Sequence, residues 1–402
     1  MLTVTTVFKF FLNTRQSKNI LAHRGAVPME FAEKISLADH QKAADYSTTK
    51  LRFANFSEAF DVLLLLFWTL GGGLYFLNNI VSGFELSPLM TGIVVILSLS
   101  IIGSLLSLPF SWYSTFTIEE KFGFNKTTPK VFWTDLIKGI VVSLLIGTPL
   151  LAMILWLMEK AGDNWWIWAW VVWSGFSLLM LWAYPKFIAP IFNKFSPLED
   201  ESLKVRIDAL LTKCGFKSNG IFVMDGSTRS SHGNAYFTGI GDNKRIVFFD
   251  TLLDTLNETE TEAVLAHELG HFRKKHVTKR MVMSFVFSFF GLMLLGWLSK
   301  QNWFYAAFDL EPSNHMALIL FMFTLPLFTY FLSPLGSWFS RKDEYEADAY
   351  AAENSDANAL ISGLLKMYSD NASTLTPDPL YVTFYHSHPP ALHRIQHLQS
   401  LA

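Results

Sequence analysis

The sequence predicts a mainly α-helical, multi-pass membrane protein with a small α+β domain on one side of the membrane. Hydrophobic residues make up 51% of the 402 residues and charged residues only 16%, whereas roughly a quarter of the residues in soluble domains are charged. Six apolar segments are long enough, at about 20 residues, to cross a bilayer. Residues 193–280 instead combine the patterns of an amphipathic helix and short strands, as a small soluble domain does.

Six membrane spans follow from the apolar segments. In chain order they are residues 60–81, 89–110, 139–158, 165–183, 281–298 and 315–335. Residues 4–12 are also apolar, but they cover about half a span and lack the cleavage site of a signal peptide. We expect them to be the end of a first helix that begins before this numbering, or an interfacial anchor. The predicted total is about seven transmembrane helices.

Basic residues alternate between the loops and thereby predict the topology. The loops at 82–88, 159–164 and 299–314 hold at most one Lys or Arg each, whereas the other segments outside the spans hold several. The positive-inside rule places the basic segments in the cytoplasm. We therefore expect four regions: a membrane region at 1–192, a cytoplasmic core at 193–280, a two-span hairpin at 281–335 and a cytoplasmic C-terminal part at 336–402.

The chemically most informative run is His-Glu-Leu-Gly-His at residues 267–271. On a helix, His267 and His271 project from one face about 6 Å apart. Glu268 then leans toward the open side of a bound metal, as in H-E-x-x-H metallopeptidases. The alternative is a polar surface helix with two incidental histidines. The apolar neighbours at helical spacing favour a buried helix and a zinc site.

A catalytic zinc site needs a third protein ligand beside the position of the water. On a continuous helix His276, five residues past His271, would be turned away from the ligand face. Glu344 and Asp348 lie four residues apart on a later helix, so they share a face. We predict Glu344 as the ligand and Asp348 as the acceptor of a ligand histidine N–H. Acidic spacing alone is equally typical of a charged surface, which is what we expect of Glu346.

The soluble part begins with an amphipathic helix and continues with three strands. The predicted helix covers residues 203–214, and the strands cover 220–225, 234–239 and 245–250. Peptidases often hold substrate as an added strand on a free sheet edge. The alternative is a structural β-meander that takes no part in binding.

The C-terminal segment contains polar groups suited to a reacting carbonyl. His388 and Arg394 flank two prolines that suit a helix start. They could stabilise an oxyanion or bind a substrate carboxylate, although each alone is more often a surface or capping residue. The formal net charge of −2 argues against a nucleic-acid partner.

Several motifs together resemble the type I CAAX prenyl endopeptidases, which are integral-membrane zinc proteases. They are Arg15-Gln16, residues 35–46, 118–125, 184–190 and 229–239, the helix with His267, the helix with Glu344 and His388-Pro-Pro. The resemblance runs over essentially the whole chain. It implies seven spans around a large intramembrane chamber, zinc near its cytoplasmic end, and removal of the aaX tripeptide after a prenylated cysteine.

The resemblance also implies roles for individual residues. Glu344 matches the third zinc ligand, and His388 and Arg394 match residues that face the cleaved bond or order the site. The substrate-binding edge corresponds to Asn234, Ala235, Tyr236 and Phe237.

We therefore expect one zinc ion bound by His267, His271 and Glu344, with Glu268 as the general base. The expected partners are a peptide or protein substrate, prenylated if the resemblance extends to specificity, and the lipid bilayer. The expected location is a bacterial inner membrane or the endoplasmic reticulum membrane, with the zinc site toward the cytoplasm. One alternative is a broader quality-control metalloprotease that acts on unprenylated peptides. A membrane scaffold with structural zinc is disfavoured, because such a site needs no base like Glu268.

Overall fold

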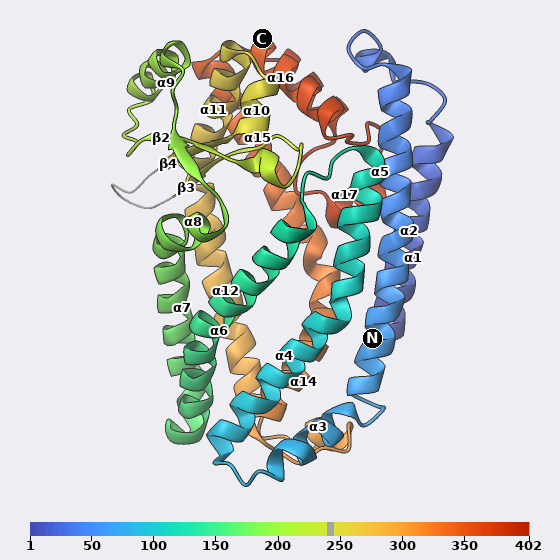
Figure 1. The fold of residues 1–402 in the computed structure, drawn as a ribbon, viewed down its shortest axis with the longest axis vertical. Helices are drawn as coiled ribbons and strands as arrows, with labels where there is room; N and C mark the ends of the chain where they lie inside the picture. The colour runs from blue at the N-terminus through green and yellow to red at the C-terminus, as the bar shows by residue number, and fades with distance from the viewer. Residues whose placement is uncertain (239–244, 402) are drawn as a thin grey trace.

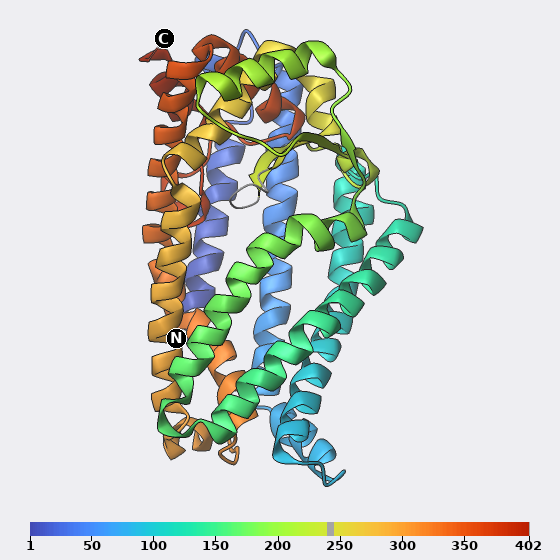
Figure 2. The ribbon, with the colours of Figure 1, turned by 90° about the vertical axis from the view of Figure 1, so that its left-hand side faces the viewer.

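The computed structural model describes residues 1–238 and 245–401, so Gly239 of the predicted second strand lies outside the described residues. Long helices run along one common direction, and a small sheet with shorter helices caps one end of them (Figure 1). The C-terminus lies at this capped end, as the view at right angles also shows (Figure 2).

The membrane part consists of helices whose bounds follow in chain order: α1 (Leu2–Ala22), α2 (Leu37–Trp68), α3 (Gly73–Ser82), α4 (Pro88–Tyr113), α5 (Glu120–Phe122), α6 (Pro129–Lys160), α7 (Trp165–Ala183), α8 (Ala189–Phe192), α12 (His276–Leu298), α13 (Asn302–Ala306), α14 (Asn314–Thr329) and α15 (Ser333–Asn354). Within the described residues five helical columns are long and apolar enough to cross a membrane. A sixth results if α2 and α3, bent by 52°, form one span.

Four of the six predicted spans lie within single helices, namely α4, α6, α7 and α12. The predicted span 60–81 is wrong as one straight helix, because α2 ends at Trp68 and the chain turns before α3 begins. Gly72 has a φ of +75° at this turn, a conformation that glycine adopts without a steric penalty. Three consecutive glycines, Gly71–Gly73, are the sequence signal of this break.

The two ends of the membrane part also differ from the prediction. Residues 4–12 belong to α1, a helix of 21 residues that packs along α2 and is not among the five apolar columns. The predicted span 315–335 crosses a short 3-10 turn and continues into α15 as one column of 41 residues. The predicted boundary at 335/336 therefore lies inside α15, so a membrane helix runs directly into the segment with Glu344.

The capping domain contains a four-stranded sheet in the order β1-β2-β4-β3. The strands are β1 (Phe195–Pro197), β2 (Ile221–Met224), β3 (Ala235–Thr238) and β4 (Arg245–Phe249). The three predicted strands are confirmed, whereas β1 is too short to show an alternating pattern. β2 and β4 pair in parallel, and β3 pairs with β4 on its outer side. The sheet is therefore not a simple meander, and β3 is an edge strand within the described residues.

Helices from distant parts of the chain share one core with this sheet. They are α9 (Glu201–Lys213), α10 (Asp250–Thr255), α11 (Glu258–Arg273), α16 (Ala357–Asp370) and α18 (Ala391–Gln399), whereas α17 (Pro379–Tyr385) packs against α15 and α1. A single hydrophobic cluster contains residues of α9, β4, α11, α15, α16 and α18. Residues 193–280 and the C-terminal part thus pack as one unit around α11.

Helix α11 begins with a capping box. The Asn257 side chain accepts a hydrogen bond from the Glu260 N–H, and the Glu260 carboxylate accepts one from the Asn257 N–H. Glu260 also binds Lys366 and Ser362 of α16. The start of α11 is therefore fixed both locally and against α16.

Candidate metal centre

Two helices bring together the three predicted metal ligands. Helix α11 carries His267 and His271, and α15 carries Glu344. The two histidine Nε2 atoms lie 3.2 Å apart. Glu344 Oε2 lies 3.4 Å from Nε2 of His267, and its Oε1 lies 3.2 Å from Nε2 of His271. Tetrahedral bonds of about 2.1 Å would separate two ligand atoms by roughly 3.4 Å, so the three groups fit a zinc-sized ion.

Burial of Glu344 supports the same fit. The residue is 3% exposed, and its Oε2 has no hydrogen-bond partner among the described residues. A buried carboxylate oxygen without a partner is costly, and a bound cation would satisfy it. The cluster of His267, His271 and Glu344 is the group of potential metal ligands found in the described part of the chain.

The second nitrogen of His267 contacts the residue predicted to orient it. Asp348 Oδ1 lies 2.8 Å from Nδ1 of His267, and Asp348 is fully buried. Arg394 donates two hydrogen bonds to the Asp348 carboxylate, from Nε at 2.8 Å and from Nη2 at 2.7 Å. Arg394 is itself buried, and Nη2 also lies 3.1 Å from Nδ1 of His267. Nη2 lies 3.2 Å from Nε2 of His267 as well, and Nη1 lies 3.8 Å from Glu344 Oε2, so the guanidinium contacts the ligands and the Asp348 carboxylate together.

The second nitrogen of His271 contacts His276, a residue that the prediction had set aside. Nδ1 of His276 lies 3.0 Å from Nδ1 of His271. The prediction assumed a continuous helix, but α11 ends at Arg273 and Lys275 has a left-handed φ of +59° before α12 starts. Glu346, which we expect on a charged surface, is partly exposed, and its Oε2 lies 3.2 Å from Nε2 of His276.

Glu268 lines a cavity of about 520 Å³ in front of the ligands. No described residue forms a hydrogen bond with the Glu268 carboxylate. Burial raises the pKa of Glu268 above the usual range, which brings it nearer to neutrality, as a general base requires. Coulombic attraction to His267 and His271 partly opposes this shift.

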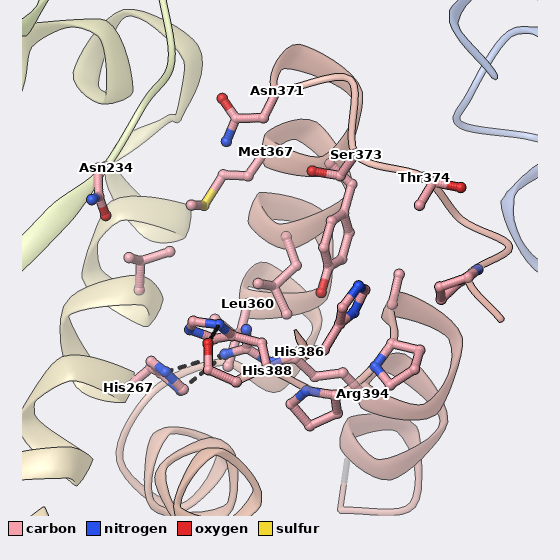
Figure 3. A pocket seen from close by; sticks show the side chains of 18 of the residues that line it. Asn234, His267, Leu360, Met367, Asn371, Ser373, Thr374, His386, His388 and Arg394 are labelled. Atoms are coloured by element: carbon pink, nitrogen blue, oxygen red, sulfur yellow. Dashed lines mark hydrogen bonds between the residues drawn. The ribbon is translucent and has the colours of Figure 1, made fainter. Parts of the chain in front are cut away.

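Segments from three parts of the chain form the cavity wall (Figure 3). Asn234 lies on one side, α16 contributes Leu360 and Met367, and the C-terminal segment contributes His386, His388 and Arg394. Nε2 of His388 lies 3.5 Å from Glu344 Oε1, and the side chain is 64% exposed. The amphipathic pattern of α16 identifies its buried face, but nothing in the sequence shows that α16 lines this cavity.

Of the four residues predicted to bind substrate, Asn234 lines the cavity. Ala235 is buried in the hydrophobic cluster, and Tyr236 is half-buried. The Phe237 ring meets the ring of Phe272 on α11 edge-on, with centroids 5.2 Å apart. These contacts position strand β3 beside the helix that carries the metal ligands.

The segments 35–46, 118–125 and 229–239, for which the sequence suggests no chemical role, contribute residues that meet beside Asn234. The Tyr46 hydroxyl donates to the Glu119 carboxylate at 2.8 Å. His232 lies 3.8 Å from the same carboxylate, and its Nδ1 lies 3.0 Å from Oδ1 of Asn371. Together Tyr46, Glu119, His232 and Asn371 connect α2 and the turn after α4 to the loop that leads into β3 and to the end of α16.

Comparison with known proteins agrees with this arrangement. Residues 16–194 match the family described as CAAX prenyl protease N-terminal, five membrane helices, and residues 197–402 match peptidase family M48. The probable CAAX prenyl protease 1 of Schizosaccharomyces pombe is 34% identical over 400 residues, which cover 96% of this chain and 84% of that protein. The CAAX prenyl protease 1 homolog of Homo sapiens is 32% identical over 445 residues, which cover 98% of this chain and 93% of that protein.

A solved structure extends the likeness to three dimensions. The crystal structure of S. mikatae Ste24p matches with a TM-score of 0.94 and 31% sequence identity, and the match covers 99% of this chain and 97% of that one. The predictions of a mainly helical multi-pass membrane fold and of a metalloendopeptidase are thereby confirmed. The chain belongs to the CAAX prenyl protease family of M48 metallopeptidases.

Proposed function

We propose that this protein is a zinc endopeptidase that removes the aaX tripeptide from prenylated CAAX substrates. The observation that carries the proposal is the placement of His267, His271 and Glu344 at distances that suit zinc, with Glu268 beside them at the cavity. Two imidazoles and one carboxylate form a donor set typical of catalytic zinc. The prenylated substrate is proposed from the names of the relatives.

A zinc ion held by His267, His271 and Glu344 would supply Lewis-acid chemistry, polarising the scissile carbonyl and lowering the pKa of a bound water toward about 7. Glu268 takes a proton from the attacking water as the new C–O bond forms. It then passes this proton to the leaving nitrogen as the peptide C–N bond breaks.

The other site residues bind or position the reacting groups. His388 faces the ligand cluster from the cavity side, where a ring N–H can donate to the developing oxyanion. We assign Arg394 a positioning role, since its hydrogen bonds to Asp348 hold the carboxylate that contacts His267. Asn234 and the edge of β3, which pairs with no further strand among the described residues, accept the substrate as an added strand.

The proposed location follows from the alternation of basic loops. The metal centre then lies on the cytoplasmic side of the bacterial inner membrane or of the endoplasmic reticulum membrane. In this arrangement the unit built from residues 193–280 and 336–402 faces the cytoplasm. The two-span hairpin at 281–335 leaves that side and returns to it, and residues 1–192 form the rest of the membrane region with its cytoplasmic loops.

A cleavage assay tests the proposal. The purified protein would be incubated with a farnesylated CAAX peptide and with its unlipidated counterpart, each with and without a chelator. We expect chelator-sensitive release of the tripeptide from the farnesylated peptide, and no release by a Glu268→Gln control. Equal cleavage of both peptides would replace the prenyl specificity with the broader quality-control activity. Turnover that survives the chelator would refute the metal mechanism.

A further inference from the structure

We propose that His276 and Glu346 form a relay that fixes the metal-binding tautomer and orientation of His271. The inference rests on the metal site proposed above and concerns positioning residues that touch neither substrate nor the reacting atoms. It gives His271 a support that differs in kind from the support of His267, which contacts the Asp348 carboxylate directly.

The distances allow one consistent assignment of protons. If Nε2 of His271 binds the metal, its Nδ1 carries the hydrogen and donates to Nδ1 of His276 across 3.0 Å. Nε2 of His276 must then carry its hydrogen and donate to Glu346 Oε2 at 3.2 Å. Asp343 Oδ1, 3.5 Å away, is a second carboxylate near the same nitrogen. The neutral His276 ring thus couples the negative charge of the two carboxylates to His271, which is a metal ligand.

The burial of His276 indicates that its contacts are part of the folded structure and not a chance arrangement at the surface. His276 is 1% exposed, so its two ring nitrogens need protein partners. Each has one, His271 on one side and the carboxylates of α15 on the other. His276 contacts Nδ1 of His271, on the opposite side of that ring from the metal-binding Nε2. It is therefore a partner of a ligand and not a fourth ligand.

The turn between α11 and α12 places the His276 side chain beside His271. Lys275 has a φ of +59°, a left-handed conformation that a non-glycine residue adopts at an energetic cost. His276 is the first residue of α12, directly after this turn. The two histidine rings meet edge-on with centroids 5.2 Å apart. The turn thus returns the chain to the far side of the His271 ring.

Zinc affinity, measured by competition with a chromophoric chelator, is the direct test. We expect His276→Ala to weaken zinc binding by about 10- to 100-fold. His276→Asn should keep most of the affinity, because the amide oxygen can accept from His271 near the position of the lost Nδ1. Glu346→Ala should weaken binding by a smaller factor, since Asp343 remains near His276. The exposed Glu353 of α15 provides the matched control, and Glu353→Ala should bind zinc as the wild type does.

A double variant separates the relay from general loss of structure. Asparagine has no group in place of Nε2–H, so adding Glu346→Ala to His276→Asn should cause no further loss of affinity. Additive losses would overturn the relay. If the wild type binds zinc and His276→Ala binds it with the same affinity, the relay is also overturned. A wild type that binds no zinc would refute the proposed function instead. If His276→Ala fails to fold, the Asn and Glu346 variants still decide the question.

Discussion

Gly270 lies directly against Ala347 where α11 crosses α15. A Cβ atom on Gly270 would lie 2.9 Å from Cα of Ala347 and 3.0 Å from its carbonyl oxygen. Backbone atoms cannot move aside as a flexible side chain can, so the glycine is what permits this close crossing. The crossing places Glu344, three residues before Ala347, next to the two histidines of α11. Gly270, in the middle of the His-Glu-Leu-Gly-His run, thus serves the packing that completes the site.

Gly270→Ala should therefore separate α11 from α15. We expect a loss of zinc affinity and a lower melting temperature, equivalent to about 1–3 kcal/mol of overpacking. Metal analysis and thermal unfolding of the detergent-solubilised protein would measure both. Gly291→Ala in α12 is the matched control, because a Cβ there meets nothing within 4 Å. Full zinc binding by Gly270→Ala would show that the crossing tolerates a methyl group.

Glu268→Gln should keep zinc and lose turnover. The carboxamide cannot accept the water proton, while the three ligands are unchanged, so kcat should fall by about 10²- to 10⁴-fold. Zinc content measured beside turnover of the farnesylated peptide checks this. Turnover near that of the wild type would remove Glu268 from the mechanism.

Glu344→Ala should strip the metal and abolish activity, because it removes one of three ligands. Asp348→Asn should be milder and weaken zinc binding by about 10- to 100-fold, since the ligands remain but His267 loses its charged acceptor. The ranking is read from zinc affinity, without reference to turnover. A zinc-replete Glu344→Ala protein would mean that another residue supplies the third ligand.

Glu119→Gln should affect substrate binding more than metal binding. The change weakens the charge-assisted hydrogen bond from Tyr46 and alters the group that lies beside His232, so the loop before Asn234 should be held less firmly. We expect a raised KM for the peptide with unchanged zinc affinity. The exposed neighbour Glu120 gives the control variant Glu120→Gln. A parallel loss of zinc would show that the cluster supports the metal centre itself.

Glu260 should make part of the protein's stability depend on pH. Burial opposes its charge, but hydrogen bonds from Lys366, the Asn257 N–H and Ser362 hold its pKa below the usual value. A lowered folded-state pKa contributes stability above the unfolded-state value, about 4.3, and this contribution is lost as the pH falls through the folded-state pKa. Glu260→Gln should lower the melting temperature at pH 7. The difference in melting temperature between the variant and the wild type should become smaller toward pH 4. A constant gap would contradict this linkage.

Local patterns in the sequence were sufficient for four of the six predicted membrane spans and for placing the candidate metal-site residues of each helix on one face. Apolar runs identified α4, α6, α7 and α12, because the bilayer requires about 20 apolar residues wherever a helix crosses it. Helical spacing placed His267 and His271 on one face, because 3.6 residues form each turn. The same argument placed Glu344 and Asp348 on one face of a second helix. These properties depend on neighbouring residues alone, so the sequence determined them without the fold.

The tertiary structure decided which distant groups meet. The turn at Lys275 brought His276 behind His271, and the topology put β3 beyond β4 at the sheet edge. Packing of α18 against α16 and α15 directed Arg394 to Asp348. Each outcome depends on a backbone break or on a contact between segments far apart in the chain. Helical spacing carries no information across such a break, because the direction of the following segment is set by its packing.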